Sequence, residues 1–177
     1  ERKSDEFLLS LALPIQEVDP LVQLPILAKG EQFRFLWDGA PGLCIAATGE
    51  CQHLDLAGPR RFELAHKFSS TTLGRIKNVV PQAPSQANPR ILISFSFFDQ
   101  ISERKRSFAA SPPLQALLPR WQLSAEGSSG WLRFNGVPAN AAEIREMVEE
   151  LWLMKRKIIS SSNDRSVLAK SIIPGIF

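Results

Sequence analysis

The first half of the chain carries its apolar residues in short runs and alternations, a pattern that favours β-strands over helices. Phe7 to Leu13 is an apolar run closed by Pro14, and it predicts a buried strand. From Gln32 to Trp37 the aromatic residues occupy every second position, so they share one face of a second predicted strand.

A group of turn-forming residues, Asp38 to Gly42, separates that strand from an apolar segment over Leu43 to Ala47. Gly49 marks a further turn, and Gln52 to Leu56 can form a third strand. The spacing of these turns predicts a meander of short antiparallel strands.

Two helices are predicted among these strands. Asp19 and Pro20 have the residue types of an N-cap and a first helical position, but Pro25 follows so soon that this helix must be short or broken. Apolar residues at nearly helical spacing predict a second helix from Pro59 to about Val79.

The middle of the chain returns to strands. Pro81 to Pro89 contains three prolines and predicts a surface loop. Arg90 to Phe98 is apolar on both faces and predicts a central strand. Arg120 to Ala125 and Trp131 to Phe134 flank a loop of five residues, which predicts a hairpin.

The last predicted helix is the clearest. Asn140 followed by Glu143 is a capping-box arrangement at its start. An apolar stripe repeats along it with a period of 3.6 residues, formed by Ile144, Met147, Val148, Leu151, Trp152 and Ile158. The polar run from Ser160 to Asp164 predicts its end, and residues 160–177 read as an irregular tail. We expect an α+β fold with a mostly antiparallel sheet and two main helices, in one domain over residues 1–159.

Composition is compatible with a single folded domain. The 177 residues are 44% apolar and include 11 Phe and 4 Trp, which is ample for a core. The net charge is +3, and the two densest basic clusters, Arg104 to Arg106 and Lys155 to Lys157, carry no nucleic-acid recognition motif. We therefore expect no nucleic-acid partner.

The same features predict a soluble, cytoplasmic protein without a membrane partner. Two cysteines are too few for a disulfide scaffold, and no apolar run approaches the roughly 20 residues that cross a bilayer. Residues 1–6 are highly charged and lack the apolar core of a signal peptide. Because the chain does not begin with Met, an upstream targeting segment stays open.

Candidate catalytic and metal-binding residues are few. His53 and His66 have no nucleophile motif around them, and single histidines of this kind are more often packing or surface residues. With a turn at Gly49, Cys44 would lie across from His53 and near Cys51, which suggests zinc. Zinc sites usually show closer cysteine pairs and a fourth ligand, so buried free cysteines are the commoner case.

Three carboxylates on the last helix, Glu146, Glu149 and Glu150, could bind a divalent cation. They are more typical of a solvated face opposite the apolar stripe. The residues alone therefore support no catalytic, cofactor-binding or metal-binding assignment.

Five segments stand out in a fixed order: Arg34 to Asp38, Ile45 to Gly49, Phe95 to Asp99, Leu118 to Leu123, and Asn140 to Ile158. Together they resemble the isochorismate synthases, chorismate-utilising enzymes, of the bacterial or cyanobacterial type. The first looks like the family's Arg-Phe-Tyr-Trp-Glu strand, and the fourth like its Leu-Pro-Arg strand. The likeness covers roughly Glu6 to Ile158 and implies the N-terminal half of the chorismate-utilising fold.

The resemblance also implies a chemistry. The family converts chorismate to isochorismate with Mg²⁺, for menaquinone, phylloquinone or siderophore synthesis. A lysine acts as the general base on water, a glutamate acts as the general acid on the 4-hydroxyl group, and further glutamates hold the Mg²⁺. These residues belong to the later half of the family's fold, so none is assigned in this chain.

The sequence departs from the family pattern at two places. No Thr-Pro-Glu segment occurs, and the string nearest to the family's Lys-Val-Val-Leu-Ala-Arg strand begins with Arg165, which cannot serve as a general base. Leu92 and Ile93 stand where the family has Gly-Gly before its Phe-Ser-Phe strand.

Two functional hypotheses outweigh a third, nucleic-acid binding through the two basic clusters, and whether the chain is an enzyme is left open. The first is the N-terminal part of an isochorismate synthase, inactive alone, whose partner is the catalytic part as a separate chain and which takes chorismate only when completed. The alternative is a non-catalytic interaction module, whose open sheet edges and apolar faces recruit another protein.

Overall fold

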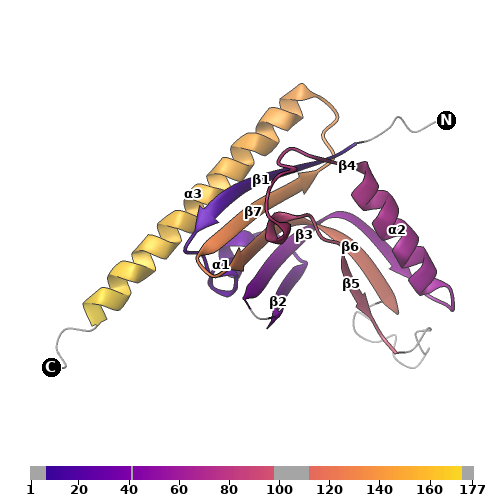
Figure 1. Cartoon of the computed structure of the whole chain (residues 1–177), viewed down its shortest axis with the longest axis horizontal. Helices are drawn as coiled ribbons and strands as arrows, with labels where there is room; N and C mark the ends of the chain where they lie inside the picture. The colour runs from indigo at the N-terminus through magenta and orange to yellow at the C-terminus, as the bar shows by residue number, and fades with distance from the viewer. Residues whose placement is uncertain (1–6, 41, 98–111, 173–177) are drawn as a thin grey trace.

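A computed structural model describes residues 7–40, 42–97 and 112–172 of the chain (Figure 1). The strands are β1 (Leu8–Gln16), β2 (Arg34–Ala40), β3 (Leu43–Leu56), β4 (Ile76–Asn78), β5 (Leu92–Phe95), β6 (Leu114–Glu126) and β7 (Ser129–Gly136). The helices are α1 (Pro20–Leu27), α2 (Arg61–Arg75) and α3 (Ala141–Ile172), with a short 3-10 helix, η1 (Ser85–Ala87).

The described strands form one seven-stranded sheet. Its order is β2-β3-β6-β7-β1-β4, and β5 pairs with β6 beside this path. The pairing of β1 with β4 is parallel, and the other described pairings are antiparallel. The prediction of an α+β fold with a mostly antiparallel sheet and two main helices is therefore confirmed.

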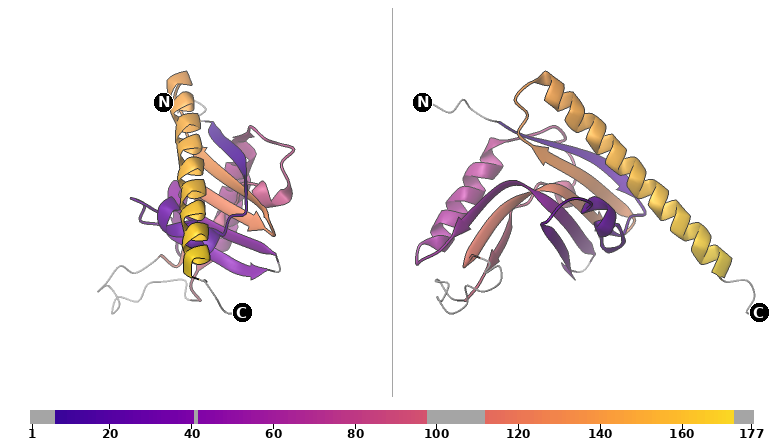
Figure 2. Two further views of the ribbon diagram at one scale, coloured as in Figure 1. Left: turned by 90° about the vertical axis from the view of Figure 1, so that its left-hand side faces the viewer. Right: turned by 180° about the vertical axis from the view of Figure 1, so that it is seen from behind.

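The two long helices lie at different ends of this curved sheet (Figures 1 and 2). α3 runs along β1 and β7 and extends past the sheet, whereas α2 lies against β6 and β3. The main core lies between the sheet and α3, where Trp121, Leu132 and Phe134 pack with Leu151 and Ile158. A smaller apolar cluster beneath α2 contains Ala65, Leu114 and Ala116.

The start of the chain folds largely as predicted. Asp19 caps α1 by accepting a hydrogen bond from the Leu21 amide at 2.9 Å, and the helix is short, with Pro25 inside it. The predicted end of the first strand at Pro14 is wrong, because β1 continues to Gln16. The Glu17 amide donates to the Ser128 carbonyl, and the backbone groups of successive residues in an antiparallel strand face opposite edges of that strand. The Pro14 nitrogen, three residues earlier, therefore faces away from β7. It also lies beyond Ser10, the last residue of β1 that pairs with β4, so a proline is tolerated there.

The predicted turn at Gly49 is also wrong, because β3 passes through it as one strand of 14 residues. Gly49 adopts a φ of +66°, and the register with β6 shifts between Glu50 and Gln52. β6 is itself 13 residues long and keeps both halves of β3 paired. The glycine therefore bends the sheet at an irregularity instead of reversing the chain.

The predicted central strand over Arg90 to Phe98 is wrong as well. β5 has four residues and pairs with β6 over Leu114 to Leu117, because β7 occupies the same edge of β6 from Trp121 onward. It therefore lies at an edge, with the Phe95 side chain 59% exposed. The prediction for Phe98 and the basic cluster Arg104 to Arg106 lie outside the described residues.

Three helix and turn boundaries differ from expectation. The second helix ends at Arg75, and Ile76 to Asn78 form β4 instead of a last helical turn. The hairpin between β6 and β7 has a two-residue loop, Gly127 and Ser128. The predicted break at Ser160 to Asp164 is wrong, since α3 continues to Ile172. The predicted domain boundary at residue 159 stays a prediction.

The predicted loop over Pro81 to Pro89 packs on a buried polar layer of the sheet. Gln122, Ser124 and Arg133 alternate with the apolar core residues of β6 and β7 and are at most 1% exposed. Their side chains donate to the carbonyl oxygens of Asn88, Gln86 and Ala87, respectively. The loop itself is mostly exposed, as predicted, and side-chain donors of the sheet satisfy its backbone acceptors where it covers the sheet.

Candidate functional site

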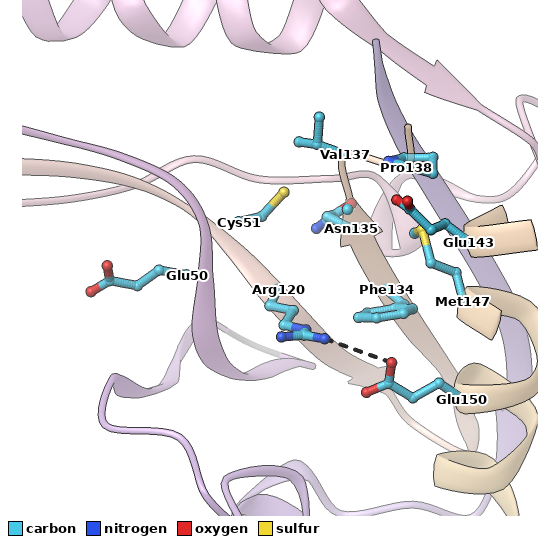
Figure 3. A pocket seen from close by; sticks show the side chains of 11 residues that line it. Glu50, Cys51, Arg120, Phe134, Asn135, Val137, Pro138, Glu143, Met147 and Glu150 are labelled. Carbon is cyan, nitrogen blue, oxygen red and sulfur yellow. Dashed lines mark ion pairs between the residues drawn. The ribbon is translucent and has the colours of Figure 1, made fainter. Parts of the chain in front are cut away.

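A pocket of about 260 Å³ lies where the first turns of α3 approach the bend of the sheet (Figure 3). β3 contributes Glu50 and Cys51, β6 contributes Arg120, β7 contributes Phe134, Asn135 and Gly136, the connection contributes Val137 and Pro138, and α3 contributes Glu143, Met147 and Glu150. Strands distant in the sequence and one helix therefore build it together.

Arg120 is the exposed residue of an otherwise buried segment of β6. Its Nη2 atom lies 3.7 Å from Glu150 Oε2, and these side chains are 45% and 44% exposed (Figure 3). Its guanidinium carbon lies 5.4 Å from the centre of the Phe134 ring. The ion pair is open to water, so it holds Arg120 only weakly and leaves the cation free to meet a ligand.

Phe134 gives the pocket a fixed apolar wall. It lies opposite Trp121 in the β6–β7 pairing, and the two rings stack with centres 4.1 Å apart and planes 11° apart. Both side chains are 2% exposed. Arg120 therefore rests on an aromatic pair that the core already holds in place.

The polar end of the pocket is fixed by the start of α3. The Asn140 side-chain oxygen accepts hydrogen bonds from the amides of Ala142 and Glu143, and the Glu143 carboxylate accepts from the Ala139 amide and the Asn140 side chain. The predicted capping box is confirmed. It also commits both Glu143 oxygens to the cap, so this carboxylate is less available for a ligand.

The Cys51 thiol in this pocket is not activated as a nucleophile. Burial raises its pKa to about 11, although the nearby Arg120 acts in the opposite direction. No histidine lines the pocket, and the Glu50 carboxylate lies 3.2 Å from Nδ1 of His53 on the outer part of β3. At neutral pH Cys51 is therefore a protonated thiol.

The charges of the pocket favour some ligands over others. The lining of the pocket includes three carboxylates, those of Glu50, Glu143 and Glu150, and one guanidinium, that of Arg120. Such a lining suits a neutral or cationic small molecule better than a dianion. In the described parts of the chain no three His, Cys, Asp or Glu side chains lie close enough to hold a metal ion.

The structure separates the residues weighed for zinc. Cys44, Cys51 and His53 all lie on β3, and the hairpin that would have brought Cys44 opposite His53 does not form. Nine residues of extended strand separate Cys44 from His53 by about 30 Å. His66 lies exposed on α2 and is not among the residues that line the pocket.

Sequence reasoning missed Arg120 as a site residue. The signal was a charged residue within the run Leu117 to Leu123, which is otherwise almost entirely apolar. Of the three carboxylates on the last helix, Glu150 turns toward Arg120, whereas Glu146 and Glu149 are exposed. The predicted solvated face is therefore correct for two of the three.

The sequence model of a family described as chorismate binding enzyme matches residues 1–173. The chain belongs to the chorismate binding enzyme family. A search of the curated proteins finds no match to it. Within the described ranges of this family member, none of the helices has the length and apolar character needed to cross a membrane.

Two of the segments that resemble isochorismate synthases meet at the pocket of this chorismate binding family member. Arg120 comes from the Leu118 to Leu123 segment on β6, and Glu150 comes from the Asn140 to Ile158 segment on α3. Two further segments that the structure describes in full, Arg34 to Asp38 on β2 and Ile45 to Gly49 on β3, belong to the same sheet. These four segments thus form one connected framework.

Proposed function

We propose that this chain supplies the N-terminal framework of an isochorismate synthase and does not convert chorismate by itself. The observation that carries the proposal is the family match over residues 1–173. The contact between Arg120 and Glu150, which joins two isochorismate synthase-like segments, supports the finer assignment.

The chemistry of the pocket supports the absence of independent turnover. Conversion of chorismate needs a general base for water, a general acid for the departing hydroxyl group and a cation for a substrate with two carboxylates. The pocket offers a protonated Cys51 thiol and three carboxylates against one guanidinium. Repulsion between these carboxylates and the dianionic ring acid opposes productive binding.

The missing groups would then come from a further polypeptide segment. We expect it to bring the lysine base, the glutamate acid and the glutamates that hold Mg²⁺, as the family chemistry requires. Arg120 is the residue of this chain that we expect to reach one substrate carboxylate, because its ion pair with Glu150 is half exposed and easily exchanged.

The test is a reconstitution. The purified 177-residue chain is incubated with chorismate and Mg²⁺, alone and with the catalytic half of an isochorismate synthase as a separate polypeptide, and isochorismate is measured by chromatography. We expect product only from the combination, and at least tenfold less with Arg120→Ala, whereas the control Lys157→Ala matches the wild type. Isochorismate formed by the 177 residues alone would contradict the proposal.

A non-catalytic interaction module is the second candidate, favoured by apolar side chains exposed around β5. Phe62 of α2 and Phe95 of β5 are in edge-to-face contact, with centres 5.4 Å apart, yet each ring stays about half exposed. Phe97 follows, 96% exposed. A module of this kind would give no isochorismate in the reconstitution, and Arg120→Ala would leave its partner binding unchanged.

A further inference from the structure

α3 carries a second apolar stripe that the sheet does not cover. Met147, Leu151 and Ile158 are buried against the core, whereas Val148, Trp152 and Ile159 are 38%, 48% and 40% exposed. These three lie about a quarter turn away from the buried face. No other element in the described ranges covers them, and all three views show α3 on the outside of the molecule (Figures 1 and 2).

The exposed side of α3 is also a groove between side-chain ridges. Glu149, Trp152, Leu153 and Arg156 are among the residues that line it, and all of its lining comes from α3. The Lys155 ammonium lies 5.2 Å from the centre of the Trp152 ring and holds that ring against the helix. A half-exposed tryptophan beside an open groove is typical of a protein contact.

The two halves of α3 differ in the sign of the charge that predominates. Glu146, Glu149 and Glu150 precede Trp152, with Arg145 among them, and Lys155 to Lys157 follow it. Glu149 and Arg156 are both exposed and are seven residues apart, so they lie on one side of the helix, two turns from each other. The midpoint between them falls beside Trp152.

This arrangement is self-complementary. We propose that α3 packs antiparallel against α3 of a second copy of this chain, with a twofold axis beside Trp152. The axis places Glu149 of each copy next to Arg156 of the other, on the same flank of the contact, while Val148, Trp152 and Ile159 form its apolar centre. A parallel pairing of two α3 helices would instead place Glu149 beside Glu149 and Arg156 beside Arg156. Binding to a different protein would not require the acidic half of α3 to be complementary to its own basic half.

The contact is small and therefore weak. One pair of helices buries less surface than the roughly 800 Å² per partner of a standard stable interface. The dimer is expected to form and dissociate over micromolar concentrations. The inference goes beyond chorismate chemistry and does not depend on the proposed function.

A charge-exchange experiment tests this dimer. The full chain is studied by sedimentation equilibrium from about 1 to about 200 µM, a range suited to a weak interface. We expect concentration-dependent dimers for the wild type and monomers for Glu149→Arg and for Arg156→Glu, with unchanged circular dichroism. An equimolar mixture of the two variants should form a heterodimer, because one cross-chain pair keeps its native signs and the other is restored with its signs exchanged.

A matched control is Lys157→Glu, which makes the same charge change one residue away and outside this flank; it should dimerise like the wild type. Trp152→Ala should weaken the dimer at least tenfold without changing charge. A monomeric wild type at every concentration, variants that dimerise like the wild type, or a mixture that stays monomeric would each overturn the proposal.

Discussion

Gly130 of β7 lies directly against Val18 and the end of β1. A Cβ atom on residue 130 would fall 2.5 Å from Val18 Cγ1 and 3.0 Å from the Ile15 carbonyl oxygen. The backbone at Gly130 has no positive φ, so the requirement for glycine is one of space. The close approach allows β1 to turn toward α1 immediately after pairing with β7.

Gly130→Ala should therefore destabilise the fold, by about 1–3 kcal/mol in urea unfolding, since the backbone of β1 would have to move. The matched substitution is Gly136→Ala, where a new Cβ would meet the Met147 Cε atom at 2.7 Å. A methionine end can change rotamer, so that variant should lose less than about 1 kcal/mol. Equal losses at the two positions would refute the distinction between a fixed and a movable neighbour.

Arg133 should be among the most sensitive positions of the fold. It is fully buried, and it donates to the Ala87 carbonyl, the Ser10 hydroxyl and the Asn78 side chain. Burial, with the nearby cation of Arg90, lowers its pKa to about 10. Arg133→Met removes these three hydrogen bonds. It leaves the Ala87 carbonyl without its side-chain donor, whereas Asn78 keeps a bond from the Val80 amide, and it should cost about 2–4 kcal/mol in urea unfolding.

Arg120→Met is the control for Arg133→Met, because it makes the same change on the neighbouring strand at a half-exposed position. It should change the free energy of unfolding by less than about 0.5 kcal/mol. A loss at Arg133 as small as the loss at Arg120 would show that the polar layer does not hold the loop.

The fold class was predictable because many elements are set by residues close together in the sequence, and there the sequence pattern agrees with the tertiary structure. The hairpin of β6 and β7 and the cap formed by Asn140 are of this kind. The predictions for Gly49 and for the segment around Phe95 were wrong because both depend on pairing with β6, which is distant in the sequence. Whether a glycine turns a strand or bends it depends on the length of the strand beside it, and β6 is distant in sequence.

The site was less predictable than the fold. Arg120 becomes meaningful only when α3 brings Glu150 to within 3.7 Å, across 30 positions of the chain. Cys51 and Glu50 reach the same pocket because β3 does not turn at Gly49. The periodicity of the sequence predicts neither the contact between Arg120 and Glu150 nor the place of Glu50 and Cys51 in the pocket. The charge of Arg120 within an apolar strand, however, was a usable signal.

The buried thiol of Cys51 gives a pH dependence with a definite sign. Its pKa rises from 9.0 to about 11 on folding, so between these values the folded chain keeps a proton that the unfolded chain releases. The free energy of unfolding should therefore fall as pH rises from 9 toward 11, by on the order of 2 kcal/mol. Cys51→Ala should remove this part of the decline, and a decline of the same size in that variant would contradict the assignment.

Alkylation gives a second measurement of the same group. In the Cys44→Ala variant, which leaves Cys51 as the remaining thiol, reaction with iodoacetamide at pH 8 should be roughly 100-fold slower than in the urea-unfolded chain, in proportion to the thiolate fraction. The rate should rise with pH toward a midpoint near 11. A midpoint near 9 in the folded chain would mean that Cys51 is open to solvent.

The ion pair of Arg120 and Glu150 should contribute little to stability. Both side chains are about 45% exposed, so water and salt screen their attraction. A double-mutant cycle of Arg120→Ala and Glu150→Ala should give a coupling energy below about 1 kcal/mol, and that coupling should shrink further in 1 M salt. A coupling that is larger and insensitive to salt would show that the pair is structural. If the coupling is small, loss of isochorismate formation in Arg120→Ala reports on ligand binding, since the fold does not depend on this residue.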